Sequence, residues 1–250
     1  MDKDFPVVLI NGLIGCLDYP FLHDALVPRS VIAPDLLGYG RLDAVEADEI
    51  DIAAQVEHLH RTLQDCSPGQ RVHLIGHSVG GVVAVEFARR YPLCVASIVS
   101  IEGNFTLNDA FWSSSVAQMT VEHAESMLTG FRADTGGWLA RSGIEVNSQR
   151  LATATAWLNY QPAGTLQAMA RSVVQVTSDP GYLPGLKALF SSVRIHLVAG
   201  ERSLANWDVP QWARQLATSM TVLPGVGHLM MLEGPEGFAR EMARIINSAK

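Results

Sequence analysis

The stretch Gly76-His77-Ser78-Val79-Gly80-Gly81 decides the fold of this chain. It follows an apolar run that starts at residue 71, and it leads into Val-Val-Ala at residues 82–84. This order predicts a buried strand, a sharp turn carrying Ser78, and a helix that begins directly after the turn. A match to Gly-x-Ser-x-Gly often arises by chance. The prediction of a strand–turn–helix therefore rests on the apolar run before the motif and the helical pattern after it.

The chemistry of such a turn suits a nucleophilic serine. The turn forces the serine into a strained backbone conformation, so its neighbours must be nearly free of side chain. The helix that follows directs free N–H groups and a positive dipole end at developing negative charge. A purely structural turn would not require Ser78 at the carboxyl end of a strand, where open α/β sheets bind ligands. A phosphate-binding loop is excluded because no Lys-Ser or Lys-Thr follows the glycines.

Short apolar runs alternate with helical patterns along the chain, which predicts an α/β fold with a mostly parallel sheet of about six strands. Continuous apolar runs are typical of strands covered by helices on both faces. The expected strands are residues 7–10, 30–33, 71–76, 95–101, 194–199 and 220–223. The clearest flanking helices are residues 51–63, 79–90 and 236–248.

One connection breaks this alternation. Residues 104–192 contain no clear strand and several helical segments rich in Trp, Met, Ala and Ser. So long a stretch is unusual as a structureless loop in a compact domain. We therefore expect residues 1–103 and 193–250 to form the core, with 104–192 inserted before the penultimate strand as a helical cap that ends near the last core helix.

Four segments, in this order, resemble the capped α/β-hydrolase superfamily, and its serine esterase branch in particular. They are Asn11-Gly12 after the first strand, the run Pro34 to Gly40, the stretch 76–81, and Gly225 to His228. The resemblance implies an oxyanion hole made by the main-chain N–H groups of Val79 and Leu13. Two departures stand out: no hairpin precedes the first strand, and Asn11 occupies the position where the family usually has His.

His228 is the expected general base. It follows the last strand in a glycine-rich loop that can reach over the edge of the sheet. A neutral imidazole suits this role because its ordinary pKa of about 6.5 lies near working pH. The order Ser, acid, His also matches the fold. The other histidines are assigned to helices or strands, and His77 to lining of the site.

The triad acid is the difficult assignment. Aligning on the segment that follows residues 194–199 puts Ser203 where the family usually has Asp, and a serine cannot carry the negative charge that stabilises an imidazolium. Glu102 is the preferred candidate because it ends a buried apolar strand at the catalytic edge. Asp208 is an alternative, although it has the pattern of a helix N-cap. Glu201 lies near the right loop but two positions early.

Aromatic and apolar residues of the insertion are expected to enclose the substrate. A pocket of this kind is mostly hydrophobic with a few polar groups. The expected reaction is cleavage of a small, largely apolar carboxylic ester, or a related acyl compound, through an acyl-enzyme. A ligand receptor on the same fold and a cofactor-free carbon–carbon hydrolase or lyase are the alternatives. The expected lining residues are Ile14, His77, Phe105, Phe111, Trp112, Trp138 and Trp157.

Composition sets the remaining expectations. The net charge of −7 opposes nucleic-acid binding. The three cysteines include no Cys-x-x-Cys pair and favour a reducing, cytoplasmic location. No apolar run reaches the ~20 residues of a membrane span. No histidine clusters with metal-ligating residues, and the chemistry needs no metal or organic cofactor. The oligomeric state stays open.

Overall fold

Six apolar segments of the chain form one parallel sheet in the computed structural model, which describes residues 5–248. The sheet order is β2-β1-β3-β4-β5-β6, and every neighbouring pair is parallel. The predicted six-stranded sheet is therefore confirmed. The strands are β1 (Val7–Ile10), β2 (Val31–Ile32), β3 (Val72–His77), β4 (Val95–Ile101), β5 (Arg194–Gly200) and β6 (Ser219–Leu223).

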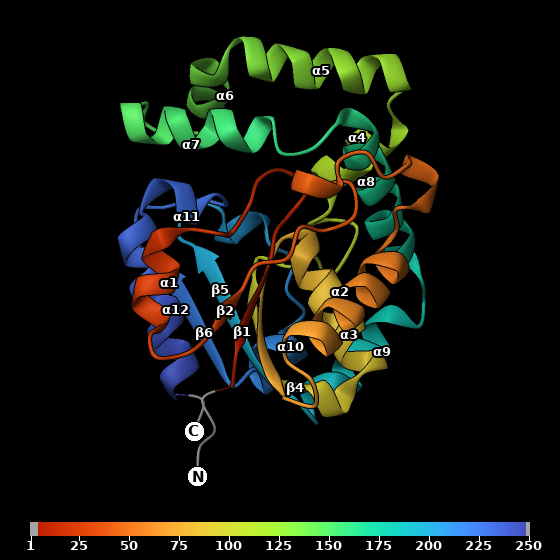
Figure 1. Cartoon of the computed structure of the whole chain (residues 1–250), viewed down its shortest axis with the longest axis vertical. Helices are drawn as coiled ribbons and strands as arrows, with labels where there is room; N and C mark the ends of the chain where they lie inside the picture. Colours follow the sequence, from red (N-terminus) through yellow and green to blue (C-terminus); the bar gives the residue numbers. More distant parts are fainter. Residues whose placement is uncertain (1–4, 249–250) are drawn as a thin grey trace.

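Helices cover both faces of this sheet, which explains why its central strands are apolar along their whole length. In Figure 1, α1 and α12 lie on one side of the strands, and α2, α3 and α9 lie on the other. The α-helices are α1 (Pro20–Leu26), α2 (Ile52–Cys66), α3 (Val79–Arg90), α4 (Phe111–Gln118), α5 (Val121–Ala133), α6 (Thr135–Arg141), α7 (Ser148–Leu158), α8 (Ala163–Ser178), α9 (Tyr182–Phe190), α10 (Gln211–Leu216), α11 (Met230–Glu233) and α12 (Pro235–Ser248). Within the part of the chain that the structure describes, no helix is both long enough and apolar enough to cross a bilayer.

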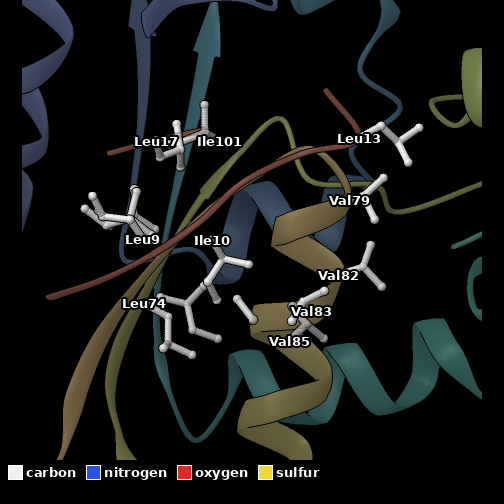
Figure 2. Close-up of a cluster of buried hydrophobic side chains, with 14 of the residues drawn as sticks. Leu9, Ile10, Leu13, Leu17, Leu74, Val79, Val82, Val83, Val85 and Ile101 are labelled. Atoms are coloured by element: carbon white, nitrogen blue, oxygen red, sulfur yellow. The ribbon is translucent and has the colours of Figure 1, made fainter. Parts of the chain in front are cut away.

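The packing of α3 against the sheet fixes the segment that carries Ser78. Ile10 of β1 points toward α3, whereas Leu9 lies on the opposite side of the strand, as the alternation of a strand requires (Figure 2). Val82 and Val83 on α3 are buried as well, and all four side chains are at most 2% exposed. This close packing makes α3 a rigid support for the turn that precedes it.

The sheet order reverses between β1 and β3, so the loops that follow these two strands diverge at the carboxyl edge of the sheet. Open α/β sheets bind their ligands at such a point. The loop after β1 carries Leu13, and the turn after β3 carries Ser78. The topology therefore brings together two segments that lie more than sixty residues apart in the sequence.

The long connection between β4 and β5 is helical, as predicted. It holds α4 to α9, and none of its residues 104–192 belongs to a strand. Helices α5, α6 and α7 lie beyond the carboxyl ends of the strands, at the top of Figure 1. Helix α8 packs against α4 and α5 and also contacts α2 and α3, so it joins these upper helices to the core.

Besides His77 at the end of β3, two buried histidines lie within the sheet, in the strands where the sequence predicts them. Nδ1 of His73 on β3 is 2.8 Å from Oγ of Ser97, and Nδ1 of His196 on β5 is 2.8 Å from Oγ of Ser219. The other ring nitrogen of His196 is buried without a hydrogen-bond partner. Burial, followed by the field of nearby cations, lowers the pKa of each histidine to about 4.

We expect these two histidines to make the fold acid-sensitive between about pH 6.5 and pH 4. Their folded-state pKa values lie below the ordinary value of 6.5, so the unfolded chain binds more protons. Their stabilising effect is full above pH 6.5 and is lost as the pH falls to about 4. Urea unfolding at several pH values should show a smaller acid loss for the double variant His73→Asn, His196→Asn than for the wild type. Equal pH slopes in the two proteins would contradict this explanation.

Candidate active site

The predicted strand–turn–helix around Ser78 is present. β3 ends at His77, α3 begins at Val79, and Ser78 between them has φ +53° and ψ −122°. A non-glycine residue in this region is strained, and such strain persists only where surrounding contacts hold it. The Ser78 N–H donates to the carbonyl of Ile101 at 2.9 Å, and its carbonyl accepts from Gly81 N–H at 2.8 Å. The Ser78 side chain makes no capping bond to α3, which leaves the hydroxyl available for chemistry.

The glycines of this segment are required by close backbone approach. A Cβ on Gly76 would overlap the carbonyl oxygen of Gly80, and a Cβ on Gly80 would overlap that of Ile10. A Cβ on Gly12, in the loop after β1, would lie 3.2 Å from Cβ of Ser78. The segments 11–13 and 76–81 are thus in direct backbone contact.

His228 and Glu102 form a hydrogen-bonded pair. Nδ1 of His228 is 2.6 Å from Oε2 of Glu102, although the two residues lie 126 positions apart. An ionised carboxylate only accepts hydrogen bonds, so Nδ1 carries the proton and Nε2 of the neutral ring is free to accept one. His228 keeps 45% of its side chain exposed, whereas Glu102 exposes only 4%. The pair therefore extends from a carboxylate in the protein interior to an imidazole that is partly exposed.

Glu102 is held by contacts from the neighbouring strand. It directly follows β4 and has φ +44°, a second strained residue at this edge of the sheet. Its Oε1 accepts from Gly200 N–H at 2.8 Å and from Ser203 Oγ at 2.5 Å. Burial opposes ionisation of this carboxyl, but the hydrogen bonds and charge of His228, with Ser203 and Gly200, outweigh it and lower the pKa of Glu102.

The two alternative acids lie elsewhere. Asp208 accepts hydrogen bonds from Thr106 Oγ1 at 2.7 Å and Asn108 Nδ2 at 2.9 Å. Its predicted role as a helix N-cap is wrong, because α10 begins only after Pro210 and leaves Asp208 too far upstream. Glu201 is exposed and accepts from Gly225 N–H at 2.8 Å. The structure shows neither in contact with His228.

The two residues expected to supply the oxyanion hole both lie beside Ser78. Val79 is the first residue of α3, and the first N–H groups of a helix have no partner within the helix. Leu13 lines the same cavity as Ser78. The hydroxyl of Tyr39 donates to the Leu13 carbonyl at 3.2 Å and fixes the orientation of that segment. The role of Tyr39 is not evident from the sequence.

Hydrogen bonds and an ion pair hold the loop that carries His228 in place. Nε2 of His77 donates to the His228 carbonyl at 3.0 Å, and burial, followed by the charge of His228, keeps the pKa of His77 well below its ordinary value. The adjacent Gly227 N–H donates to Glu233 Oε1 at 2.8 Å. Arg202 pairs with Glu233 and also donates to the Gly143 carbonyl between α6 and α7 at 2.6 Å. These contacts join the insertion to the loop of His228.

A cavity of about 590 Å³ lies over Ser78, Glu102 and His228. Its volume is within the usual range for small-molecule sites. Five of the predicted lining residues contribute to it: Ile14, His77, Phe111, Trp112 and Trp138. Its other lining residues are Leu13, Asn104, Asp109, Ser113, Phe131, Arg141, Ser142, Ser203, Asn206, Trp207 and Leu229.

Two lining predictions are wrong. Phe105 does not line the cavity; it is buried in an aromatic cluster, with its ring centroid 5.9 Å from that of Trp207 and 6.2 Å from that of Phe190. Trp157 packs against Tyr19 at 5.9 Å between ring centroids and fills the space over Gly15. Both rings find apolar partners in the interior, and that burial takes them away from the substrate space.

Several polar residues of the cavity wall were not predicted. Asp109 holds the turn at 104–106 by accepting from Phe105 N–H at 2.9 Å and from Asn104. Burial, partly offset by those hydrogen bonds, raises the pKa of Asp109 to about 6. Trp207 donates from Nε1 to the Gly103 carbonyl at 2.8 Å. No motif marks these residues: Asp109 is held within its own irregular loop, and Trp207 is placed by a segment 104 positions away.

Across residues 5–248, no group of three or more His, Cys, Asp or Glu side chains is placed to hold a metal ion. The charged groups of the cavity wall are Glu102 with its histidine, Asp109, and Arg141, whose Nη1 lies 3.4 Å from Asp134. The arrangement can accept a proton from a hydroxyl and stabilise the imidazolium that results.

Comparison with known proteins places this geometry in a family. The model of the alpha/beta hydrolase family matches residues 7–241. Lipase 3 of a Moraxella species is 30% identical over 112 residues, 44% of this chain and 34% of the lipase. The carbamate hydrolase RutD of Escherichia coli, itself described as putative, is 32% identical over 104 residues, 41% of this chain and 39% of that protein. The alignments thus span little more than a third of these relatives.

Solved structures extend the likeness to the whole fold. A thermophilic esterase from Thermogutta terrifontis superposes with a TM-score of 0.72 at 19% identity, covering 98% of this chain and 90% of the esterase. MenH from S. aureus superposes with a TM-score of 0.69 at 18% identity, covering 100% and 96%. With the family model matched over nearly the full length, and the sheet and its helices in agreement, the chain belongs to the alpha/beta hydrolase family.

Proposed function

We propose that this chain is a serine hydrolase that cleaves small, largely apolar carboxylic esters through an acyl-enzyme. One observation carries the proposal: His228, hydrogen-bonded to the buried carboxylate of Glu102, opens into the same cavity as the strained Ser78. A serine with a strained backbone, in one cavity with a histidine oriented by a buried carboxylate, is the arrangement that nucleophilic catalysis needs.

In the proposed reaction, Oγ of Ser78 attacks the ester carbonyl while Nε2 of His228 takes the hydroxyl proton. Glu102 stays ionised and stabilises the imidazolium. The main-chain N–H groups of Val79 and Leu13 bind the oxyanion. His228 then protonates the departing alcohol, and the acyl group stays on Ser78. A water molecule, deprotonated by the same imidazole, releases the acid and restores the serine.

The side chains of the cavity wall favour binding of a substrate with an apolar acyl or alcohol group. Phe111, Trp112, Phe131 and Trp138 come from the insertion, and Ile14 comes from the loop after β1. These side chains offer no counter-charge to a substrate, and their burial against it favours hydrocarbon. In this proposal residues 104–192 are the cap over the site. Helix α8 and helix α9 near its end also pack on the core.

The relatives favour acyl chemistry of this kind. The similar proteins include lipases, esterases and a putative carbamate hydrolase, and each of these activities cleaves a bond between a carbonyl carbon and a heteroatom. Two other activities are distinguishable outcomes of the same experiment. A ligand receptor would turn over once and stay acylated, and a carbon–carbon hydrolase or lyase would act without an acylated serine.

The test is turnover and labelling of the wild-type protein. We expect repeated hydrolysis of p-nitrophenyl acetate and butyrate, and one fluorophosphonate label per chain on the peptide that contains Ser78. A matched sample, denatured before the probe is added, should remain unlabelled, because the reactivity depends on the folded site. A folded protein that neither reacts with the probe nor hydrolyses these esters would contradict the proposal.

A further inference from the structure

Ser203 touches the carboxylate that faces the proposed base. Its Oγ lies 2.5 Å from Oε1 of Glu102 and 3.3 Å from the carbonyl of Gly200. A hydroxyl has a single hydrogen to donate, and the shorter contact to an ionised acceptor takes it. The hydroxyl of Ser203 therefore donates its hydrogen bond to Glu102.

The two oxygens of Glu102 have different partners. Oε1 accepts two hydrogen bonds, from Ser203 and from the main chain of Gly200, and both donors come from the end of β5 and the turn after it. Oε2 is left for Nδ1 of His228. Since Glu102 itself follows β4, the neighbouring strand end holds one oxygen in place and thereby aims the other.

The strained backbone of Glu102 makes this support necessary. The residue has φ +44° and its N–H donates to Val198 on β5 at 3.0 Å, so the main chain turns sharply at the end of β4. A buried glutamate has three side-chain torsions to fix, and fixing them costs rotamer entropy. Donors placed at one oxygen select the rotamer that meets the histidine.

We propose that Ser203 is a positioning residue for the triad acid, which it orients through Oε1 so that Oε2 meets His228. This inference rests on the proposed function. It also explains the serine that stands where the family resemblance places an Asp: the carboxylate comes from β4, and the β5 turn supplies a hydroxyl that holds it.

The test compares Ser203→Ala with Ser203→Thr in the hydrolysis of p-nitrophenyl butyrate. Loss of a hydrogen bond to a buried charge should lower kcat of Ser203→Ala by about 10- to 100-fold. KM should change by less than about twofold, because the hydroxyl acts on Glu102 rather than on the substrate. Ser203→Thr keeps the hydroxyl and should recover most of kcat. Equal losses in the two variants would overturn the proposal.

A double-mutant cycle separates positioning from other roles. If Ser203 acts only through Glu102, adding Ser203→Ala to Glu102→Gln should cause no further loss of kcat. A full additional loss in that background would overturn the proposal. Failure of the proposed function gives a different result, in which the wild type itself neither hydrolyses the ester nor reacts with the fluorophosphonate. Failure of the acid assignment alone would leave Glu102→Gln with wild-type activity. An inactive Glu102→Gln with a fully active Ser203→Ala would refute the positioning role and leave the acid assignment intact.

Discussion

Replacing Ser78 with alanine is expected to lower kcat for p-nitrophenyl butyrate by a factor of at least about 10⁴. The hydroxyl sits at the start of α3, in the cavity that also holds His228, and no other serine combines that position with a strained backbone in the described chain. Without it, His228 has no side-chain nucleophile to activate, and only slow attack by water remains. Steady-state kinetics should show the loss in kcat with little change in KM.

The matched control is Ser191→Ala, an exposed serine just past α9. It should keep wild-type kinetics and wild-type labelling by the fluorophosphonate, whereas Ser78→Ala should lose its label. Alanine suffers the same strain as serine at φ +53°, so the melting temperature of Ser78→Ala should stay close to that of the wild type. Substantial activity in a folded, unlabelled Ser78→Ala protein would point to lyase chemistry and contradict the acyl-enzyme.

Much of this fold follows from local patterns in the sequence. The strands are apolar throughout because both faces of the sheet are covered, and α2 shows its buried face as Ile52, Val56, Leu59 and Leu63 at helical spacing. The turn at Ser78 is local as well, since the glycines it needs lie within three residues of it. Each of these elements is determined by residues that lie close together in the sequence, so its pattern can be recognised there.

The remaining details depend on distant segments. Asp208 has the sequence of an N-cap, but Thr106 and Asn108, about a hundred positions earlier, take its carboxylate. Phe105 was expected in the cavity wall, yet an aromatic cluster beneath the wall buries it. The contact of Ser203 with Glu102 depends on the pairing of β4 with β5. Such contacts come from the packing of segments far apart in sequence. The spacing of residues within one segment therefore cannot predict them.

Replacing Glu102 with glutamine should lower kcat by roughly 10⁴-fold, because it imposes the wrong tautomer on the base. Gly200 N–H and Ser203 Oγ both donate toward Oε1. In the variant these donors select the amide oxygen for that position, which leaves the NH₂ group facing Nδ1 of His228. Nδ1 must then accept a hydrogen bond, and the ring proton moves to Nε2, the nitrogen that should take the proton of Ser78.

Two carboxylates serve as controls for this prediction. Asp208→Asn and Glu201→Gln should stay within about twofold of the wild type, since each accepts hydrogen bonds that an amide oxygen can also accept and neither contacts His228. A large loss in Asp208→Asn with a fully active Glu102→Gln would move the acid to the later loop. The glutamine variant should also remain reactive with the fluorophosphonate at a reduced rate, because the oxyanion donors and the Ser78 hydroxyl are still in place. A residual rate that grows with pH would fit this mechanism, because hydroxide can then replace the imidazole as the base.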